Sequence, residues 1–360
     1  MLPCPLTLEN VDEYGVRHLV AVTRAAARFF ACLAEGSWVP GYLASRGFEP
    51  DTWRWRGVGY APAAWDELTA HLRDLGFTDP AIRAAGLAKW SGRGALIDIF
   101  RDRVMFPIRS MDGTVAGFIG RAPPGADPSI PAYLNSPTSA LYRKGQVLFG
   151  LCEAQPAVAT GSRLVITEGP LDAMAVTVAD PARYAGVALC GTALTHGQAR
   201  LLATLDWARV PARHDPCLGA AGVVVALDGD RAGRLAAVRA HRLLRGVTDD
   251  LAAVSFPPGS DPASYFREHG SAALAGLLDS SARPLADLVI DGTAARFDRW
   301  VEFTDGKFLA LRAVAPLIAG LPPGQVARQV ARVAERLALT HAEVTEAVTT
   351  ALSESPPPAP

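Results

Sequence analysis

Apolar residues in the first part of the chain recur at the spacing of an α-helix. This pattern predicts helices over 17–33, 39–45 and 65–75, the last one ending at a glycine. The pattern then becomes that of strands. Residues 103–108 and 114–119 are predicted as two strands joined by a Met-Asp-Gly turn, so this part of the chain mixes helices with antiparallel strands.

From residue 164 onward, short apolar runs alternate with helical segments. Continuous apolar strands separated by helices of about ten residues indicate a parallel sheet covered by helices on both faces. Residues 206–222 interrupt this rhythm and are expected to form an irregular insert. The predicted strands are 164–167, 187–190, 223–227 and 252–256, and the predicted helices are 171–178, 196–205 and 232–244.

After Pro284 the strand signals stop. Helical periodicity over 285–300, 307–319 and 324–352 predicts a small helical bundle. The tail 353–360 is rich in proline and is predicted to be disordered. The fold class that follows is α/β, with an α+β segment in front of a central parallel sheet and a helical bundle behind it.

Composition narrows the class of protein. Hydrophobic residues make up 49% of the chain and charged residues 20%, which is typical of a packed globular protein. Lys and Arg number 35 against 36 Asp and Glu, which excludes a histone-like polycation. No two of the five cysteines lie within four positions of one another, so we expect no zinc site. We see neither a membrane-spanning apolar run nor a secretory signal, and we expect a cytoplasmic protein without membrane contact.

Acidic residues follow two of the predicted strands directly. Glu168 comes after the strand LVIT, and Asp228 and Asp230 come after the strand VVVAL. Ligands of open parallel sheets bind outside the carboxyl ends of the strands, so these carboxylates are expected to converge on one crevice. Three carboxylates form a hard oxygen site that suits Mg²⁺ or Mn²⁺.

The alternative is that such acids are only helix caps or partners of the helix dipole. An isolated Asp-Gly-Asp favours that interpretation, but two clusters at the ends of two strands favour a metal site. Asp172 and Asp261 are weaker candidates, since each lies where a helix is predicted to begin.

A basic segment precedes the acidic one. Residues 89–121 contain six basic and three acidic side chains, and Arg101, Arg103 and Arg109 have the same parity along an extended chain. Arginine binds phosphate bidentately, and basic surfaces attract nucleic acids irrespective of sequence. Taken alone, the segment is better explained as a solvated face of a sheet. Lys144 adds a further positive charge.

At this point the motifs resemble those of a known family. LVITEGPLDAM (164–174) and VVVALDGDRAG (223–233) resemble the two signatures of the TOPRIM domain, which primases, topoisomerases and some nucleases share. Further segments resemble the catalytic core of DnaG-type bacterial primases in the same order, so that the resemblance covers roughly residues 20–350. These segments are GYLASRGF (41–48), GVGYAP (57–62), FRDRVMFPIRSMDGTVAGFIGR (100–121), YLNSP (133–137), LYRKGQVLFGL (141–151), LCGTALT (189–195) and SDPASYFREHG (260–270).

The resemblance implies a division of the chain. It implies a basic α+β subdomain over 1–155, a TOPRIM domain with a Rossmann-like parallel sheet over 160–275, a helical bundle over 283–352 and a disordered tail over 353–360. The zinc-ribbon domain and the helicase-binding domain of the family have no counterpart in the matched segments. We therefore expect this chain to lack both domains.

The resemblance also implies roles for single residues. Glu168, Asp228 and Asp230 match the metal-binding and catalytic acids of the family, and Asp172 and Asp261 match its supporting acids. The positions that match the family's subdomain for template and nucleotide are Arg101, Arg103, Arg121, Asn135 and Lys144. Two positions depart from the family pattern: Ala132 replaces a lysine in front of YLNSP, and Ala263 replaces an acid two positions after Asp261.

The function implied is Mg²⁺- or Mn²⁺-dependent synthesis of short RNA primers on single-stranded DNA from nucleoside triphosphates. A TOPRIM nuclease that hydrolyses phosphodiesters is the enzymatic alternative. A non-catalytic primase remnant that binds single strands is the other alternative. The two alanines favour it, and the intact set of three acids speaks against it. We expect a separate template-recognition or helicase protein as a partner and a plasmid, phage or integrated element as the setting.

Overall fold

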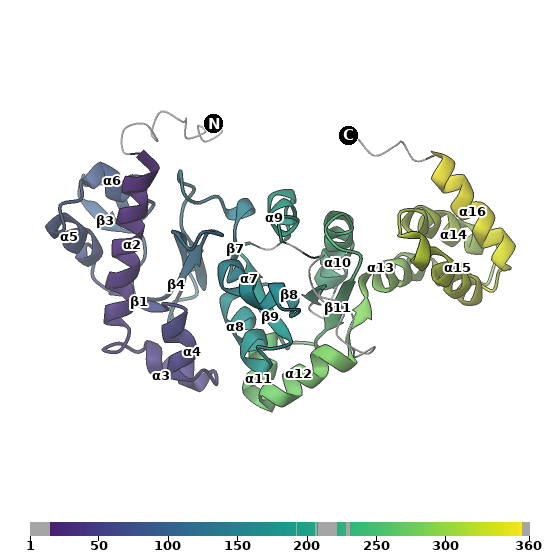
Figure 1. Ribbon diagram of the computed structural model, residues 1–360, viewed down its shortest axis with the longest axis horizontal. Helices are drawn as coiled ribbons and strands as arrows, with labels where there is room; N and C mark the ends of the chain where they lie inside the picture. Colours follow the sequence, from purple (N-terminus) through teal and green to yellow (C-terminus); the bar gives the residue numbers. More distant parts are fainter. Residues whose placement is uncertain (1–14, 192, 206, 208–221, 228–230, 355–360) are drawn as a thin grey trace.

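The computed structural model describes residues 15–191, 193–205, 207, 222–227 and 231–354. An antiparallel sheet with its helices lies at one end, a mixed sheet lies in the middle, and a group of helices lies at the other end (Figure 1). The mixed α/β class expected from the sequence is confirmed. Most of the predicted insert 206–222 and the residues after Glu354 lie outside the described part of the chain. The disordered tail predicted from residue 353 was wrong at its start, because Ser353 and Glu354 are the last residues of a helix.

The first part of the chain is built on a four-stranded sheet of order β1-β4-β5-β6, in which every pair of neighbours is antiparallel. The strands are β1 (Gly59–Ala61), β4 (Arg103–Arg109), β5 (Val115–Arg121) and β6 (Tyr133–Asn135), and a separate hairpin consists of β2 (Ala88–Trp90) and β3 (Leu96–Asp98). The helices are α2 (Gly15–Leu33), α3 (Val39–Ser45), α4 (Pro50–Trp55), α5 (Glu67–Asp74) and α6 (Asp79–Ala84). The three helices and two strands predicted here are therefore confirmed to within two residues at each end.

The apolar stripe of α2 explains why this helix packs on the sheet. Leu19, Val22, Ala26 and Phe30 are buried, and they share one apolar cluster with Met105 and Phe118 of the sheet and with side chains of α5 and α6. Phe30 and Phe118 meet edge to face with ring centroids 5.4 Å apart.

The central sheet has six strands in the order β12-β11-β10-β8-β9-β7. The inner strands β11, β10, β8 and β9 are parallel, while β12 and β7 at the edges are antiparallel to their neighbours. The expectation of a purely parallel sheet was thus wrong at both edges, because the edge strands are too short to carry a hydrophobic signal. The strands are β7 (Leu148–Phe149), β8 (Arg163–Thr167), β9 (Tyr184–Leu189), β10 (Val223–Leu227), β11 (Leu251–Ser255) and β12 (Arg283–Pro284).

Both faces of this sheet are buried, as the continuous apolar strands predict. In β8, Leu164 and Ile166 belong to the apolar cluster on one face, and Val165 belongs to the cluster on the other. The first face is covered by α7 (Leu151–Ala159), α10 (Arg231–Leu244) and α13 (Leu285–Ala294), and the second by α8 (Pro170–Ala179), α11 (Pro262–His269) and α12 (Ser271–Ser280). Helix α9 (His196–Leu202) follows β9.

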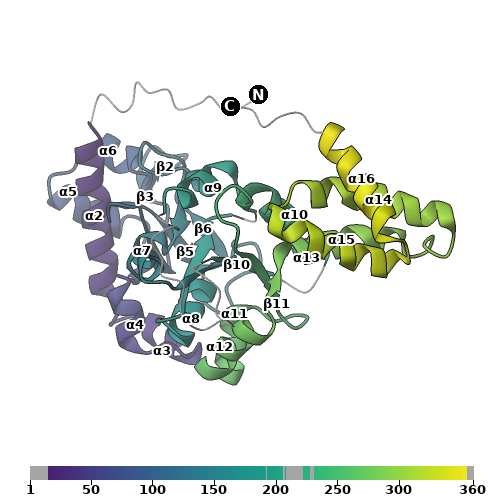
Figure 2. The same cartoon turned by 45° about the vertical axis from the view of Figure 1, so that its right-hand side comes forward.

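The last part of the chain is helical and projects beyond the sheet, with α13 leading into it (Figure 2). It consists of η3 (Ala295–Phe297), α14 (Thr304–Ala319), α15 (Pro323–Leu337) and α16 (His341–Glu354). The helical segment predicted over 324–352 is in fact two helices. Ala338, with φ +49°, ends α15 and turns the chain into α16. Among the residues described, no helix combines the length and hydropathy needed to cross a bilayer.

Candidate active site

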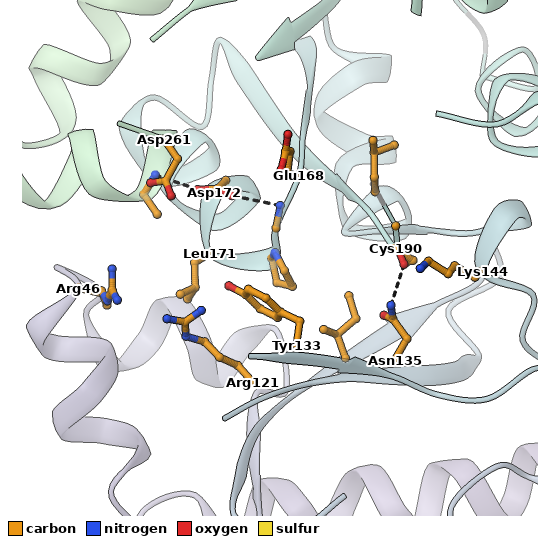
Figure 3. A pocket seen from close by; sticks show the side chains of 16 residues that line it. Arg46, Arg121, Tyr133, Asn135, Lys144, Glu168, Leu171, Asp172, Cys190 and Asp261 are labelled. Carbon is orange, nitrogen blue, oxygen red and sulfur yellow. Dashed lines mark hydrogen bonds between the residues drawn. The ribbon is translucent and has the colours of Figure 1, made fainter. Parts of the chain in front are cut away.

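A pocket of about 510 Å³ lies between the antiparallel sheet and the central sheet (Figure 3). Its two walls come from different parts of the chain. One wall is acidic and belongs to the end of β8, the start of α8 and the start of α11. The other wall is basic and aromatic and belongs to α3, β5, β6 and the segment around Lys144. The charged and polar residues that line it are Arg46, Arg121, Tyr133, Asn135, Lys144, Glu168, Asp172 and Asp261.

Asp172 organises the acidic wall. It lies in the first turn of α8, and its Oδ2 accepts a hydrogen bond of 3.1 Å from the Gly169 amide. Its Oδ1 accepts a hydrogen bond of 3.0 Å from the amide of Ala263 in α11. These two bonds fix the loop after β8 to the first turn of α11. They bring Glu168 and Asp261, which are far apart in sequence, to the same pocket.

The same wall carries an excess of negative charge. Burial, together with the negative charges of Asp261 and Glu168, raises the pKa of Asp172 to about 7, although two amides donate to its carboxylate. Asp261 itself caps α11, because its Oδ1 accepts a hydrogen bond of 2.7 Å from the Ser264 amide. Asp261 is therefore both the N-cap of α11 and a residue that lines the pocket.

Arg121 is the centre of the opposite wall. It ends β5, and its guanidinium carbon lies 5.0 Å from the ring centroid of Tyr133 and 5.5 Å from that of Tyr42. The Tyr133 hydroxyl reaches across to the acidic wall, 3.6 Å from the position that a Cβ on Gly169 would take. Burial raises the pKa of Tyr133 to about 12, so its hydroxyl is a neutral donor facing the pocket.

Asn135 and Lys144 complete this wall. The Nδ2 of Asn135 donates a hydrogen bond of 2.7 Å to the carbonyl of Cys190, which ties β6 to the end of β9. The stem of Lys144 lies against Gly191, where an added Cβ would be 2.6 Å from the lysine Cε. Because Gly191 has no Cβ, the side chain of Lys144 can pass it and reach the pocket.

Arg101 and Arg103 do not line this pocket. The Arg101 guanidinium carbon lies 4.1 Å from the ring centroid of Trp65, which is 61% exposed. Arg103 is only 5% exposed, and it donates hydrogen bonds to the carbonyls of Pro131 at 2.9 Å and Gly120 at 3.2 Å. The contacts described for Arg103 are structural, and the nucleic-acid role of both residues stays a prediction.

Asp228 and Asp230 lie outside the described residues. The strand in front of them, β10, pairs in parallel with β8, with Val225 opposite Ile166. Within the described part of the chain, no three His, Cys, Asp or Glu side chains form a group that could hold a metal ion. The site of three acids therefore stays a prediction.

Two residues that line the pocket, Arg46 and Tyr133, and Tyr42, which packs against Arg121, were missed by the sequence analysis. Arg46 and Tyr42 lie in the motif GYLASRGF, and Tyr133 is the first residue of YLNSP. Both motifs supported the family resemblance, but these three side chains were not singled out. The sequence did contain a signal for them, because the matched motifs include two tyrosines and an arginine, which are residue types that bind phosphates and bases.

Comparisons with known proteins decide the family. Residues 33–155 match a family model described as the N-terminal domain of the DNA primase catalytic core, and residues 165–266 match a model described as Toprim-like. The RNA polymerase domain of Mycobacterium tuberculosis primase DnaG is 30% identical in sequence. The match covers 89% of this chain and 99% of that domain, with a TM-score of 0.74. The chain belongs to the DnaG-type primase family.

Other members of the DnaG-type primase family agree with this result. The DNA primase of Streptomyces coelicolor is 35% identical over 290 residues, which are 81% of this chain and 43% of that protein. A DnaG primase catalytic domain solved with bound single-stranded DNA is 28% identical. It covers 90% of this chain and 98% of that domain, with a TM-score of 0.74. The chain spans about half the length of the full-length DNA primases that it matches.

Proposed function

We propose that this chain synthesises short RNA primers on single-stranded DNA from nucleoside triphosphates. The observation that carries the proposal is the pocket itself, in which carboxylates at the end of one sheet face cationic side chains of another. Phosphoryl transfer needs little covalent help from a protein. It needs positioned phosphates and compensated charge, which such a pair of walls provides.

The proposal includes the layout of the family. Residues 1–155 form the basic α+β subdomain, residues 160–275 the TOPRIM domain with its Rossmann-like sheet, and residues 283–352 the helical bundle. This division is supported by the change from the antiparallel sheet to the central sheet after β6, and by the purely helical part that begins with α13. In this layout the pocket lies where the first two subdomains meet.

The acidic wall suits Mg²⁺ or Mn²⁺. Its donors are hard carboxylate oxygens. Burial is the main reason that the pKa of Asp172 is raised, and the neighbouring charges of Asp261 and Glu168, which a cation would compensate, raise it further. Glu168, Asp228 and Asp230 would hold the ion, with Asp261 beside them. Asp172 supports them, because both of its oxygens already accept backbone hydrogen bonds. When bound, a divalent cation supplies charge neutralisation at the reacting phosphates.

The basic wall would bind and orient the substrate. Arg121, fixed against two tyrosine rings, presents planar donors that can bind a phosphate bidentately. Lys144 adds a further positive charge, and the Tyr133 hydroxyl adds a neutral donor. Arg101 and the exposed ring of Trp65 would contact the single strand, since an aromatic face next to an arginine stacks on bases and attracts phosphates.

We further propose that another protein contributes template recognition or couples the chain to a helicase, and that the chain acts in the cytoplasm. Such a partner would then supply initiation specificity.

The test is incorporation of labelled nucleotides. The full chain is incubated with single-stranded DNA, labelled nucleoside triphosphates and Mg²⁺ or Mn²⁺, beside Asp228→Ala and the surface control Asp249→Ala. We expect short RNA products from the wild type and from Asp249→Ala, and none from Asp228→Ala. Shortening of the DNA would instead identify a nuclease. Binding of DNA without any product, with either ion, would identify a single-strand-binding remnant.

A further inference from the structure

A second hollow, of about 630 Å³, lies between α14 and α16 and shares no residue with the acidic pocket. Its floor is apolar and consists of Leu311 and Ala315 from α14 and Ala347 and Ala351 from α16. Phe308 forms part of its rim and is 38% exposed. We call this hollow the α14–α16 groove.

Exposed apolar side chains are also found just before and at the start of α14, close in sequence to the rim residue Phe308. Trp300 is 59% exposed, Phe303 63% and Leu309 52%. A single exposed hydrophobic residue is ordinary, but three large ones close in sequence to Phe308 at the rim are typical of an interaction surface.

The charges on the walls of the groove are mainly negative. Glu343, Glu346 and Glu354 line it, against one positive residue, Arg312. Glu343 accepts hydrogen bonds from the Thr340 amide at 2.8 Å and from the Thr340 hydroxyl at 2.7 Å, which hold its pKa below the ordinary value and keep it ionised. Glu346 and Glu354 form no ion pair with any residue that the structure describes.

The uncharged polar groups of the groove are mostly acceptors as well. Pro316 lies inside α14 and has no N–H, so it cannot donate to the carbonyl of Arg312, one turn earlier. The hydroxyl of Thr350 already donates to the carbonyl of Glu346 at 2.9 Å, which leaves only its acceptor capacity. Apart from the Arg312 side chain, the groove offers an apolar floor, negative charge and hydrogen-bond acceptors.

We propose that the α14–α16 groove docks a basic amphipathic helix of a partner protein. The apolar face of that helix would lie on the alanine and leucine floor, and its Lys or Arg side chains would lie against Glu346 and Glu354. This is the helix-in-groove mode of recognition. Nucleic acid is the wrong occupant, because its phosphates would meet the glutamates. The inference is independent of primer synthesis, since none of these residues lines the acidic pocket.

The experiment measures binding of a defined probe to the full chain by fluorescence anisotropy. The probe is a fluorescein-labelled 14-residue model helix with leucines on one face and lysines along both edges, and a second probe has glutamates at the lysine positions. We expect the wild type to bind the lysine probe and not the glutamate probe. Glu346→Lys should weaken the lysine probe about fivefold or more and strengthen the glutamate probe, since it replaces an attraction by a repulsion.

Two matched controls separate the groove from other surfaces. Glu335→Lys makes the same charge change on the exposed side of α15, outside the groove, and should leave binding unchanged. Thr350→Trp should fill the groove and abolish binding, whereas Thr349→Trp, one residue away and outside it, should not. The proposal would be overturned if Glu346→Lys and Glu335→Lys bound the lysine probe equally well. It would also be overturned if single-stranded DNA displaced the probe from the wild type and itself failed to bind Thr350→Trp. Far-UV circular dichroism and thermal unfolding serve as the fold control for all four variants.

Discussion

Asp172 and Arg121 show how single side chains determine the geometry of the pocket. Both carboxylate oxygens of Asp172 accept hydrogen bonds from backbone amides, so this residue lines the pocket and at the same time positions two acidic loops. Arg121 is held by two tyrosine rings, so its direction is fixed before any phosphate arrives. A pocket built in this way is preorganised, because its charged groups are oriented by the protein and not by the ligand.

The stacking of Arg121 leads to the first prediction. Arg121→Lys keeps the positive charge but loses the planar contact with the two rings, so we expect kcat/KM for nucleotides to fall about tenfold or more. Arg83→Lys, an exposed position on α6, is the matched control and should be neutral. Steady-state primer synthesis measures both. Unchanged kinetics for Arg121→Lys would mean that charge alone matters at this position.

A second prediction concerns the pH dependence of stability and rests on Asp287. Burial alone would raise the pKa of Asp287, but hydrogen bonds from Arg328 and Gln329 and the charge of Arg332 outweigh it and hold the pKa below its ordinary value. The folded state therefore binds the proton more weakly than the unfolded chain does. This contribution to stability is present above pH of about 4 and is lost as the pH falls below it.

Urea unfolding at pH 7 and at pH 3 tests this prediction. Asp287→Asn should lower the free energy of unfolding by about 1–3 kcal/mol at pH 7, and it should make the loss of stability between the two pH values smaller than in the wild type. Asp298→Asn, whose side chain is 59% exposed, should change little. The same pH dependence in Asp287→Asn and wild type would exclude this role of Asp287.

The elements illustrate what sequence patterns can and cannot give. Helix 17–33 was predicted because its apolar residues recur at helical spacing, and strand 223–227 was predicted because it is a continuous apolar run. Strand β7 and strand β12 were missed, since each has only two residues and takes its conformation from its neighbours. The pocket could be anticipated from acids that follow strands, but Arg46 and Tyr133 reach it only through the contact between two sheets.

The sequence contains a signal for the break between α15 and α16. Thr340 and Glu343 form a capping box, in which the Glu343 amide donates to the Thr340 hydroxyl at 3.2 Å and the Glu343 carboxylate accepts from the Thr340 amide. The Thr-x-x-Glu spacing marks the start of a helix. It was hidden by helical periodicity that continues across the break.

A third prediction follows from the backbone at this break. Ala338 has φ +49°, in the left-handed region where a Cβ is unfavourable, so Ala338→Gly should raise the free energy of unfolding by about 0.5–1 kcal/mol. Ala331→Gly, at an exposed position inside α15, should lower it by about 1 kcal/mol. Denaturant unfolding measures both changes. We expect the free energy of unfolding to rise in Ala338→Gly and to fall in Ala331→Gly, and a fall in both variants would contradict the left-handed conformation of Ala338.

On the scale of the whole molecule, the antiparallel sheet and the central sheet are joined by a partly buried ionic contact. Arg109 of β4 donates to Glu153 of α7 at 2.5 Å and to the carbonyl of Arg56 at 3.0 Å. Arg56 is 3% exposed and donates to the hydroxyl of Thr177 in α8 at 3.0 Å. This contact holds the basic wall at a fixed position relative to α8, which carries part of the acidic wall.

The fourth prediction is that loosening this contact affects the whole chain. Glu153→Gln should lower the free energy of unfolding by about 2 kcal/mol or more, because it leaves Arg109 without its counter-charge in a mostly buried place. It should also increase protease cleavage between the two sheets. Glu35→Gln removes an exposed ion pair with Arg54 and should change stability by less than about 1 kcal/mol. If the two variants are equally stable, the ionic contact does not join the sheets.

Because the pocket is divided between two sheets, its two walls form at different times during translation. Domains emerge from the ribosome and fold from the N-terminal end onward. The basic wall, with Arg46, Arg121 and Tyr133, is complete while Glu168 and Asp261 are still to be translated. A nascent chain therefore displays cationic side chains without their acidic counterpart. The pocket is complete only when α11 has been released, so premature termination between β6 and α11 yields a polypeptide that carries the basic wall without the complete acidic wall.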